Sequence, residues 1–188
     1  MDNPSDLEVI ESVRRGNIND FSLIVDRYKN KSFTLLKKLL KNSMEAEEVL
    51  QDCFLKAYQG LNSFRSESSF STWFYRIVYN TALTRLSIKK RKVENEMSDV
   101  DEHFELKSSY DFHEAENEDM SKFINNLIKE LPEKYSTVLN LYYLNEMSCE
   151  EISEVMGISV SNVKIILYRS RNMLKDFIIK NNYVKELL

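Results

Sequence analysis

The stretch "SCEEISEVMGISVSNVKIILY", Ser148 to Tyr168, decides the fold of the C-terminal part of the chain. Ser148 and Glu151 form a capping box, which predicts the start of a short helix. Gly157 predicts the end of that helix, and Ser159 predicts the cap of a longer one after a turn of three residues. Apolar residues at helical spacing predict a core shared by both helices: Ile152, Val155, Met156, Ile158, Val163, Ile166 and Leu167. The stretch Cys149 to Tyr168 is therefore predicted to be a helix-turn-helix.

Two interpretations of this motif stay open from the pattern alone. An αα-hairpin inside a helical bundle has the same spacing and need not touch DNA. In a DNA-binding motif, polar side chains at the start of the second helix meet base edges, and basic side chains reach phosphates. The candidate DNA-contacting residues under this second interpretation are Ser159, Ser161, Asn162, Lys164, Ile165, Tyr168, Arg169 and Arg171.

A second stretch, "SFRSESSFSTWFYRIVYN", Ser63 to Asn80, joins a serine-rich loop to an aromatic segment. On a helix, Trp73, Arg76 and Asn80 follow one another at steps of three and four residues and so share one face. A core position for Trp73 is the ordinary alternative. A basic cluster that includes "KKRK" lies near the predicted end of the same helix, where a solvated basic terminus would have the same composition.

Aromatic, guanidinium and amide groups beside a basic track are what unpaired nucleotides need, because each base offers a stacking face worth about 1 to 3 kcal/mol. The polar loop Ser63 to Ser69 can close over a base that has left the duplex. The sequence therefore predicts single-strand contacts from Phe64, Arg65, Trp73, Arg76, Asn80, Arg85, Lys89, Lys90 and Arg91.

Composition predicts an all-α fold. The 188 residues contain only three glycines and two prolines, and 43% of them are hydrophobic. Ser5 with Glu8 three residues later predicts a capping box at the start of a first helix, and Gly60 lies close to the predicted end of the helix in "MEAEEVLQDCFLKAYQGL". Residues 93 to 121 hold one basic and eleven acidic residues and have no periodicity that would bury a face. We therefore predict two small helical domains, residues 1–92 and 119–188, joined by a flexible acidic linker, residues 93–118.

Several classes of function are disfavoured. Cys53 and Cys149 lie far apart in apolar patterns, with no CxxC, so reduced cysteines are expected and a metal site is not. His103 and His113 both fall in the acidic segment, where solvated side chains are expected. The sequence shows no nucleophile with a neighbouring base and no phosphate-binding glycine loop, so we expect no catalytic residues and no cofactor. A long apolar run and a signal peptide are also lacking, which predicts a cytoplasmic protein.

The two stretches together resemble the sigma-70 superfamily, specifically the extracytoplasmic-function (ECF) group of RNA polymerase sigma factors. "AEEVLQDCFLKAYQGLNSF" followed by "SSFSTWFYRIVYNTAL" is similar to region 2 of that family. "LPEKYSTVLNLYYLNEMSCEEISEVMGISVSNVKIILYRSRNMLK" is similar to region 4. The resemblance covers nearly all of the chain except the linker and both ends.

The resemblance implies partners and roles for particular residues. The segment Glu48 to Leu61 would bind the clamp helices of the largest polymerase subunit, with the following residues on or near the outer face: Glu48, Gln51, Asp52, Phe54, Leu55, Lys56 and Tyr58. Phe64 and the loop after it would capture a flipped base of the promoter −10 element, and Trp73, Arg76 and Asn80 would help to open the duplex. The helix-turn-helix would read the −35 element. Further implied partners are the polymerase flap and, in many relatives, an anti-sigma factor.

The chain departs from the family pattern in two places. Thr84 and Ser87 stand where the family often has Asp and Arg, which removes a local ion pair or phosphate contact. Ile165 and Ile166 replace a common Ser-Arg pair in the recognition helix, although Ile165 can touch a thymine methyl group. The alternative function is a free-standing helix-turn-helix regulator whose N-terminal domain binds a ligand or dimerises. Binding to core polymerase separates these two hypotheses.

Overall fold

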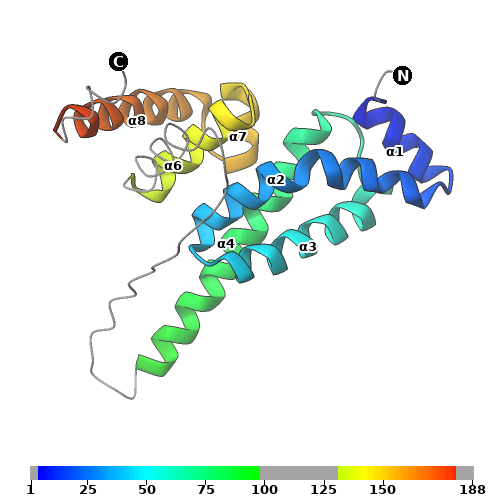
Figure 1. Ribbon diagram of the computed structural model, residues 1–188, viewed down its shortest axis with the longest axis horizontal. Coiled ribbons are helices and arrows are strands. Elements are labelled where there is room, and N and C mark those ends of the chain that lie inside the picture. The colour runs from blue at the N-terminus through cyan, green and yellow to red at the C-terminus, as the bar shows by residue number, and fades with distance from the viewer. Residues whose placement is uncertain (1–3, 98–130, 181–188) are drawn as a thin grey trace, which may run out of the picture.

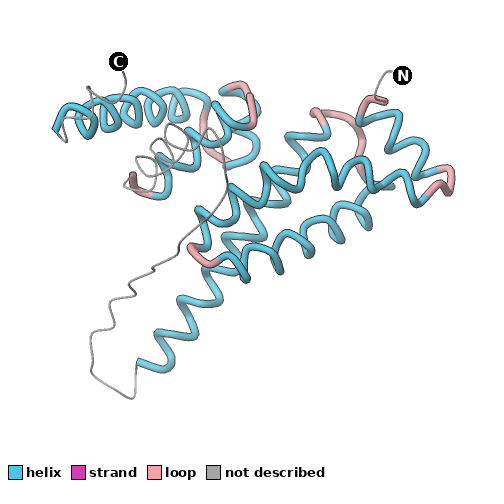
Figure 2. The backbone as a smooth tube through the Cα atoms, viewed as in Figure 1, coloured by secondary structure: helices cyan, strands magenta, loops and turns pink. Residues whose placement is uncertain are grey.

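The computed structural model describes residues 4–97 and 131–180, which form helices joined by short loops (Figure 2). The described residues contain no strand, so the predicted all-α fold is confirmed. The N-terminal unit consists of α1 (Asp6–Arg14), α2 (Phe21–Leu40), α3 (Ser43–Gly60) and α4 (Phe70–Met97). The C-terminal unit consists of α6 (Glu133–Leu139), α7 (Cys149–Met156) and α8 (Val160–Lys180) (Figure 1).

The helix boundaries of the N-terminal unit follow local sequence signals. Ser5 and Glu8 form the predicted capping box at the start of α1, in which the Ser5 N–H donates to Glu8 Oε2 at 2.7 Å. The side chain of Asn42 caps α3 by accepting the Glu45 N–H at 3.0 Å. Helix α4 continues to Met97, five residues into the segment predicted to be linker. The other predicted linker residues, 98–118, lie outside the described residues.

Aromatic rings fill the core between α2, α3 and α4. The ring of Phe54 stacks on Phe74 with centroids 4.9 Å apart, and Phe74 stacks on Phe70 at 5.9 Å. Tyr28 of α2 meets both Phe70 and Phe74 edge-on. Because these rings interlock three helices, they fix the rotation of α4 and so determine which of its faces looks outward.

The predicted helix-turn-helix is confirmed in the C-terminal unit. Ser148 and Glu151 form the expected capping box of α7, and Gly157 ends the helix in the left-handed conformation with φ of 64°. The Ser159 hydroxyl accepts the Asn162 N–H at 3.3 Å and caps α8. Ile152 and Val163 are fully buried between the two helices. A π-helical turn, η3 (Asn140–Leu144), follows α6 and was not predicted from the sequence.

The two units touch each other, which the sequence did not predict. Helix α7 packs against α4, and α6 packs against α2 (Figure 1). The Glu151 carboxylate accepts hydrogen bonds from the Ser69 hydroxyl at 3.0 Å and from the Thr72 hydroxyl at 2.9 Å. Within residues 4–97 and 131–180, no helix combines the length and the apolar character needed to cross a bilayer.

Candidate nucleic-acid interface

A hollow of about 440 Å³ opens between α3 and α4. Trp73, Arg76 and Asn80, which the sequence placed on one helix face, all line it. The Lys56 ammonium, from α3, donates to the Thr81 hydroxyl at 3.1 Å on the same wall. The lining thus combines one aromatic ring, two cations and an amide: Lys56, Trp73, Arg76, Ile77, Asn80, Thr81 and Thr84.

Trp73 is held in this hollow by its contact with Gly60. A Cβ atom on Gly60 would lie 3.1 Å from Trp73 Cζ2 and 3.2 Å from Trp73 Cη2. Gly60 has φ of −83°, so it is not needed for a left-handed turn. The sequence predicted only that Gly60 lies close to the end of a helix, and Gly60 does end α3. The packing of Gly60 against Trp73 was not predicted. A glycine facing a tryptophan cannot be recognised until the two helices are known to touch.

Phe64 lies beneath the loop that follows it. Its side chain is only 5% exposed, and its ring packs against Phe70 at 5.8 Å and Trp73 at 5.1 Å. The exposed side chains of the loop belong to Arg65, Ser66, Glu67 and Ser69, with Ser68 half-buried. Phe64 therefore supports the loop and the wall of the hollow from below, and a direct contact of its ring with an extruded base would require it to leave the core.

The basic end of α4 is paired with acidic residues of α3. The Arg85 guanidinium lies 3.0 Å from Glu45 Oε1 and 2.7 Å from Glu48 Oε2, and Lys89 Nζ lies 3.5 Å from Glu45 Oε2. Such partly exposed pairs contribute about 0 to 1 kcal/mol each, so phosphates can replace these carboxylates at little cost. Lys90 and Arg91 are exposed further along the same helix.

The outer face of α3 carries most of the predicted polymerase contacts. Exposed side chains belong to Glu48, Gln51, Asp52, Leu55 and Lys56, and Tyr58 is half-buried. Leu55 is 55% exposed, which is high for an aliphatic side chain within a folded unit. The expectation that Phe54 lies at this face is wrong, because its side chain is 9% exposed and stacks on Phe74 in the core.

The recognition helix α8 presents the predicted polar face. Ser159, Ser161, Lys164 and Arg169 are exposed, Asn162 is half-buried, and Ile165 and Tyr168 are 48% and 67% exposed. Arg171 is exposed but already engaged, since its Nε donates to the Tyr143 hydroxyl at 2.9 Å. Its guanidinium carbon also lies 5.5 Å and 5.6 Å from the ring centres of Tyr142 and Tyr143. Arg171 thus braces α8 against η3, and a phosphate contact from it stays a prediction.

Cys53 lies buried in the core of the N-terminal unit. Burial raises the pKa of Cys53 to about 11, so this thiol is protonated and poorly nucleophilic at neutral pH. Both cysteines are free, and Cys149 is half-buried. In the part of the chain that the structure describes, no group of three His, Cys, Asp or Glu side chains is placed to hold a metal ion. The surfaces described above are suited to binding.

The similarity to known proteins covers both units. Residues 24–92 match the family model described as sigma-70 region 2, and residues 124–174 match that described as sigma-70, region 4. The ECF RNA polymerase sigma-E factor of Haemophilus influenzae is 33% identical over 179 residues, covering 92% of this chain and 94% of the relative. The ECF RNA polymerase sigma factor SigW of Bacillus subtilis is 35% identical over 175 residues, covering 88% and 92%.

Solved structures show the same fold. The sigma factor RpoE of Bartonella quintana, solved with the anti-sigma factor NepR, aligns with a TM-score of 0.70 at 20% identity and covers 84% of this chain and 95% of its own. CnrH, solved with the cytosolic domain of CnrY, aligns with a TM-score of 0.66 at 20% identity and covers 94% and 99%. With two matching regions in the expected order and relatives above 30% identity along almost its full length, this chain belongs to the ECF RNA polymerase sigma factors.

Proposed function

We propose that this chain binds core RNA polymerase through α3, directs it to a two-part promoter and stabilises the melted −10 element on α4. The observation that carries the proposal is the hollow between α3 and α4, where Trp73, Arg76 and Asn80 meet on a rigid helix. The same chain presents an outward recognition helix in α8. As a transcription initiation factor, it supplies binding surfaces, while bond formation belongs to the polymerase.

The hollow has the size and chemistry to receive an unpaired base. Its volume of about 440 Å³ falls in the ordinary range of small-molecule sites, roughly 300 to 1,000 Å³. The Trp73 ring offers a stacking surface, the Asn80 amide can both donate and accept hydrogen bonds, and Arg76 can hold a phosphate. Stacking worth about 1 to 3 kcal/mol per base offsets the few kcal/mol needed to unstack the duplex.

The recognition helix supplies the second contact. Lys164 and Arg169 are exposed and can pair with phosphates, while Ser161 lies near the start of the helix, where base edges are within reach. Ile165 is 48% exposed and can meet a thymine methyl group. Residues 122–188 carry nine basic and eight acidic residues, so this unit alone should bind DNA weakly.

Polymerase supplies the affinity that the C-terminal unit lacks. With α3 bound to the enzyme, both DNA-binding surfaces act as linked sites with a high effective concentration. Asp52 and Leu55 are exposed at the centre of the predicted polymerase-binding face. The Bartonella quintana relative was solved with an anti-sigma factor. A comparable inhibitory partner stays a prediction for this chain.

Strand opening tests the proposal. Permanganate reactivity of unpaired thymines can be compared among holoenzymes that carry wild-type chain, Asn80→Ala, Trp73→Ala or the control Leu83→Ala. Leu83 is exposed on α4 but does not line the hollow. We expect Asn80→Ala and Trp73→Ala to lose permanganate reactivity near the start site. Both should keep the protection of upstream DNA that α8 provides. Unchanged reactivity in both would contradict the proposed role of the hollow.

A further inference from the structure

Helix α1 contacts the entry of the loop 64–69 directly and its exit through Tyr28 of α2, although α1 lies outside the residues that match the region 2 model. We propose that α1 is a strap that sets the position of this loop, and that Arg14 is its principal positioning residue for base selection. The proposal rests on the proposed function, because Phe64 of this loop packs against Trp73, which lines the hollow that receives the base. It adds that α1 and Arg14 help to determine which base is accepted.

Arg14 fixes the start of the loop through the backbone. Its Nε and Nη2 donate to the carbonyl oxygen of Leu61 at 3.1 Å and 2.5 Å, and Nη2 also donates to the carbonyl oxygen of Phe64 at 2.5 Å. Leu61 is the first residue of the 3-10 turn η2 (Leu61–Ser63), which follows the end of α3, and Phe64 comes directly after this turn. The Leu61 carbonyl also accepts the Phe64 N–H at 3.2 Å, and the planar guanidinium can join both carbonyls at once.

Phe64, whose carbonyl Arg14 binds, also packs against the wall of the hollow. The Phe64 ring lies 5.1 Å from Trp73 and 5.8 Å from Phe70, measured between ring centres. If the Phe64 backbone shifts, its ring must move against Trp73, which lines the hollow and also contacts Gly60. Interiors packed this tightly transmit such shifts. Arg14 therefore acts on the base site through Phe64 and Trp73 without touching DNA.

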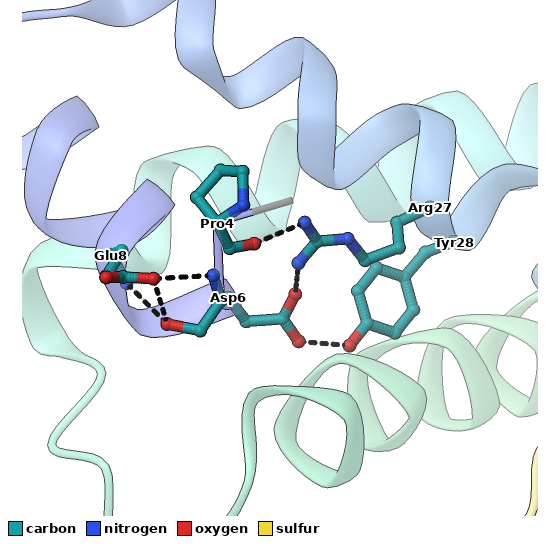
Figure 3. A network of polar contacts seen from close by, with 6 residues as sticks. Pro4, Asp6, Glu8, Arg27 and Tyr28 are labelled. Carbon is teal, nitrogen blue, oxygen red and sulfur yellow. Dashed lines mark hydrogen bonds and ion pairs between the residues drawn. The ribbon is translucent and has the colours of Figure 1, made fainter. Parts of the chain in front are cut away.

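The other end of α1 is attached to α2, which packs against the first residue after the loop. Asp6 accepts hydrogen bonds from the Tyr28 hydroxyl and from Arg27 Nη1, and Arg27 Nη2 donates to the Pro4 carbonyl at 2.6 Å (Figure 3). The Tyr28 ring packs edge-on against Phe70 at 5.5 Å and Phe74 at 5.4 Å. Phe70 is the first residue of α4, directly after the loop. The strap thus acts on the exit of the loop through Tyr28, whereas Arg14 holds the entry directly.

The loop itself needs such anchoring. Ser66 has φ of 58°, in the left-handed region, without being glycine. That conformation costs an L-residue of this kind about 1 to 2 kcal/mol and persists only where the surroundings impose it. The flanking contacts made by α1 provide that restraint.

The test compares base preference among Arg14→Met, Arg14→Lys and the matched control Arg15→Met. Arg15 is the next residue along the chain and is exposed. Each variant is assembled with core polymerase and titrated with fork-junction DNA whose single-stranded −10 segment carries each of the four bases in turn at the most discriminated position. The readout is the ratio of affinities for the best and worst base. That ratio is insensitive to the fraction of protein that is correctly folded.

We expect Arg14→Met to reduce the ratio at least fivefold, Arg14→Lys to restore part of it, and Arg15→Met to match the wild-type chain. A lysine keeps the charge but cannot bridge two carbonyls in a fixed plane. A wild-type ratio in Arg14→Met would overturn the inference and leave the proposed function standing. A wild-type holoenzyme that fails to bind the single-stranded segment would instead overturn the proposed function, and this inference with it.

Discussion

The hydroxyl of Thr72, at the start of α4, donates a hydrogen bond of 2.9 Å to Glu151 Oε1 in the capping box of α7. The two residues are 79 positions apart, so this bond links the two DNA-binding units. Burial alone raises the pKa of the Glu151 carboxyl, but hydrogen bonds from the Ser148 backbone and from the Thr72, Ser69 and Ser148 hydroxyls lower it overall. The carboxylate is therefore the form that the contact favours.

Thr72→Val should loosen the link between the units. Valine keeps the shape of this buried side chain and leaves the Ser148–Glu151 capping box intact, while it removes a charge-assisted hydrogen bond worth about 1.5 kcal/mol. We expect lower energy transfer between dyes placed on α2 and α8. Thr34→Val is the control, since that hydroxyl donates to Asn30 within α2. Equal transfer efficiency in all three proteins would show that Thr72 does not hold the units together.

Gly60→Ala should weaken strand opening while leaving the thermal stability of the chain nearly unchanged. Alanine favours the helix by about 1 kcal/mol relative to glycine, which offsets part of the crowding against Trp73 at 3.1 Å. We expect a thermal midpoint close to that of the wild-type chain but severalfold weaker strand opening, because Trp73 must move. Gln59→Ala, at the preceding exposed position, provides the control. Full strand opening in Gly60→Ala would mean that the exact placement of Trp73 is unimportant.

Asp52→Ala and Leu55→Ala should weaken binding to core polymerase by severalfold with little loss of stability, since both side chains are exposed. Phe54→Ala should instead lower the free energy of unfolding by about 3 to 5 kcal/mol, as expected for a large buried aromatic. Met44→Ala is the control, being 79% exposed on the same helix outside the predicted surface. Binding measured by fluorescence anisotropy and urea unfolding together distinguish the two effects. Wild-type affinity for core polymerase in both surface variants would show that this face of α3 is not the polymerase-binding surface.

Tyr75→Phe should alter the alkaline stability of the chain. The Tyr75 hydroxyl is buried and makes no hydrogen bond of normal geometry. Burial raises the pKa of Tyr75 to about 12, and a weak interaction with the Ser32 hydroxyl opposes only part of this rise. The folded-state pKa lies above the unfolded value of about 10. The contribution of the neutral Tyr75 to the free energy of unfolding is therefore fully present below pH 10 and is lost as the pH rises toward 12.

Replacing the tyrosine removes this dependence and also an unpaired buried hydroxyl, so stability at neutral pH should stay equal or rise by up to about 1 kcal/mol. Urea unfolding at pH 8 and at pH 10.5 measures both effects. Tyr168→Phe is the control, because Tyr168 is 67% exposed. An unchanged loss of stability at high pH in Tyr75→Phe would contradict the assignment.

The sequence predicted the local features of this fold well. Capping boxes at Ser5 and Ser148, the left-handed Gly157 and the shared face of Trp73, Arg76 and Asn80 depend on spacing within one helix or turn, which sequence displays directly. The same reasoning gave the helix-turn-helix and its outward face. These features could be predicted because helix propensity, capping residues and hydrophobic periodicity agree along each segment.

Features that depend on contact between distant segments were missed or misplaced. Phe54 and Phe64 look alike in a sequence whether they face solvent or a neighbouring ring, and both proved to be buried. The carboxylates that pair with Arg85, the fit of Gly60 to Trp73 and the grip of Arg14 on the loop all join residues at least 13 positions apart. None of these has a local signal, because each follows from how the helices pack.

Transcription reconstituted from purified core polymerase, this chain and total genomic DNA tests the central claim most directly. Sequencing the 5′ ends of the RNA should reveal start sites that core polymerase alone does not use, preceded by two shared elements at a fixed spacing. Lys164→Ala combined with Arg169→Ala should reduce their use. If the chain co-purifies with the polymerase yet the 5′ ends match those made by core polymerase alone, the chain does not act as the specificity subunit proposed here.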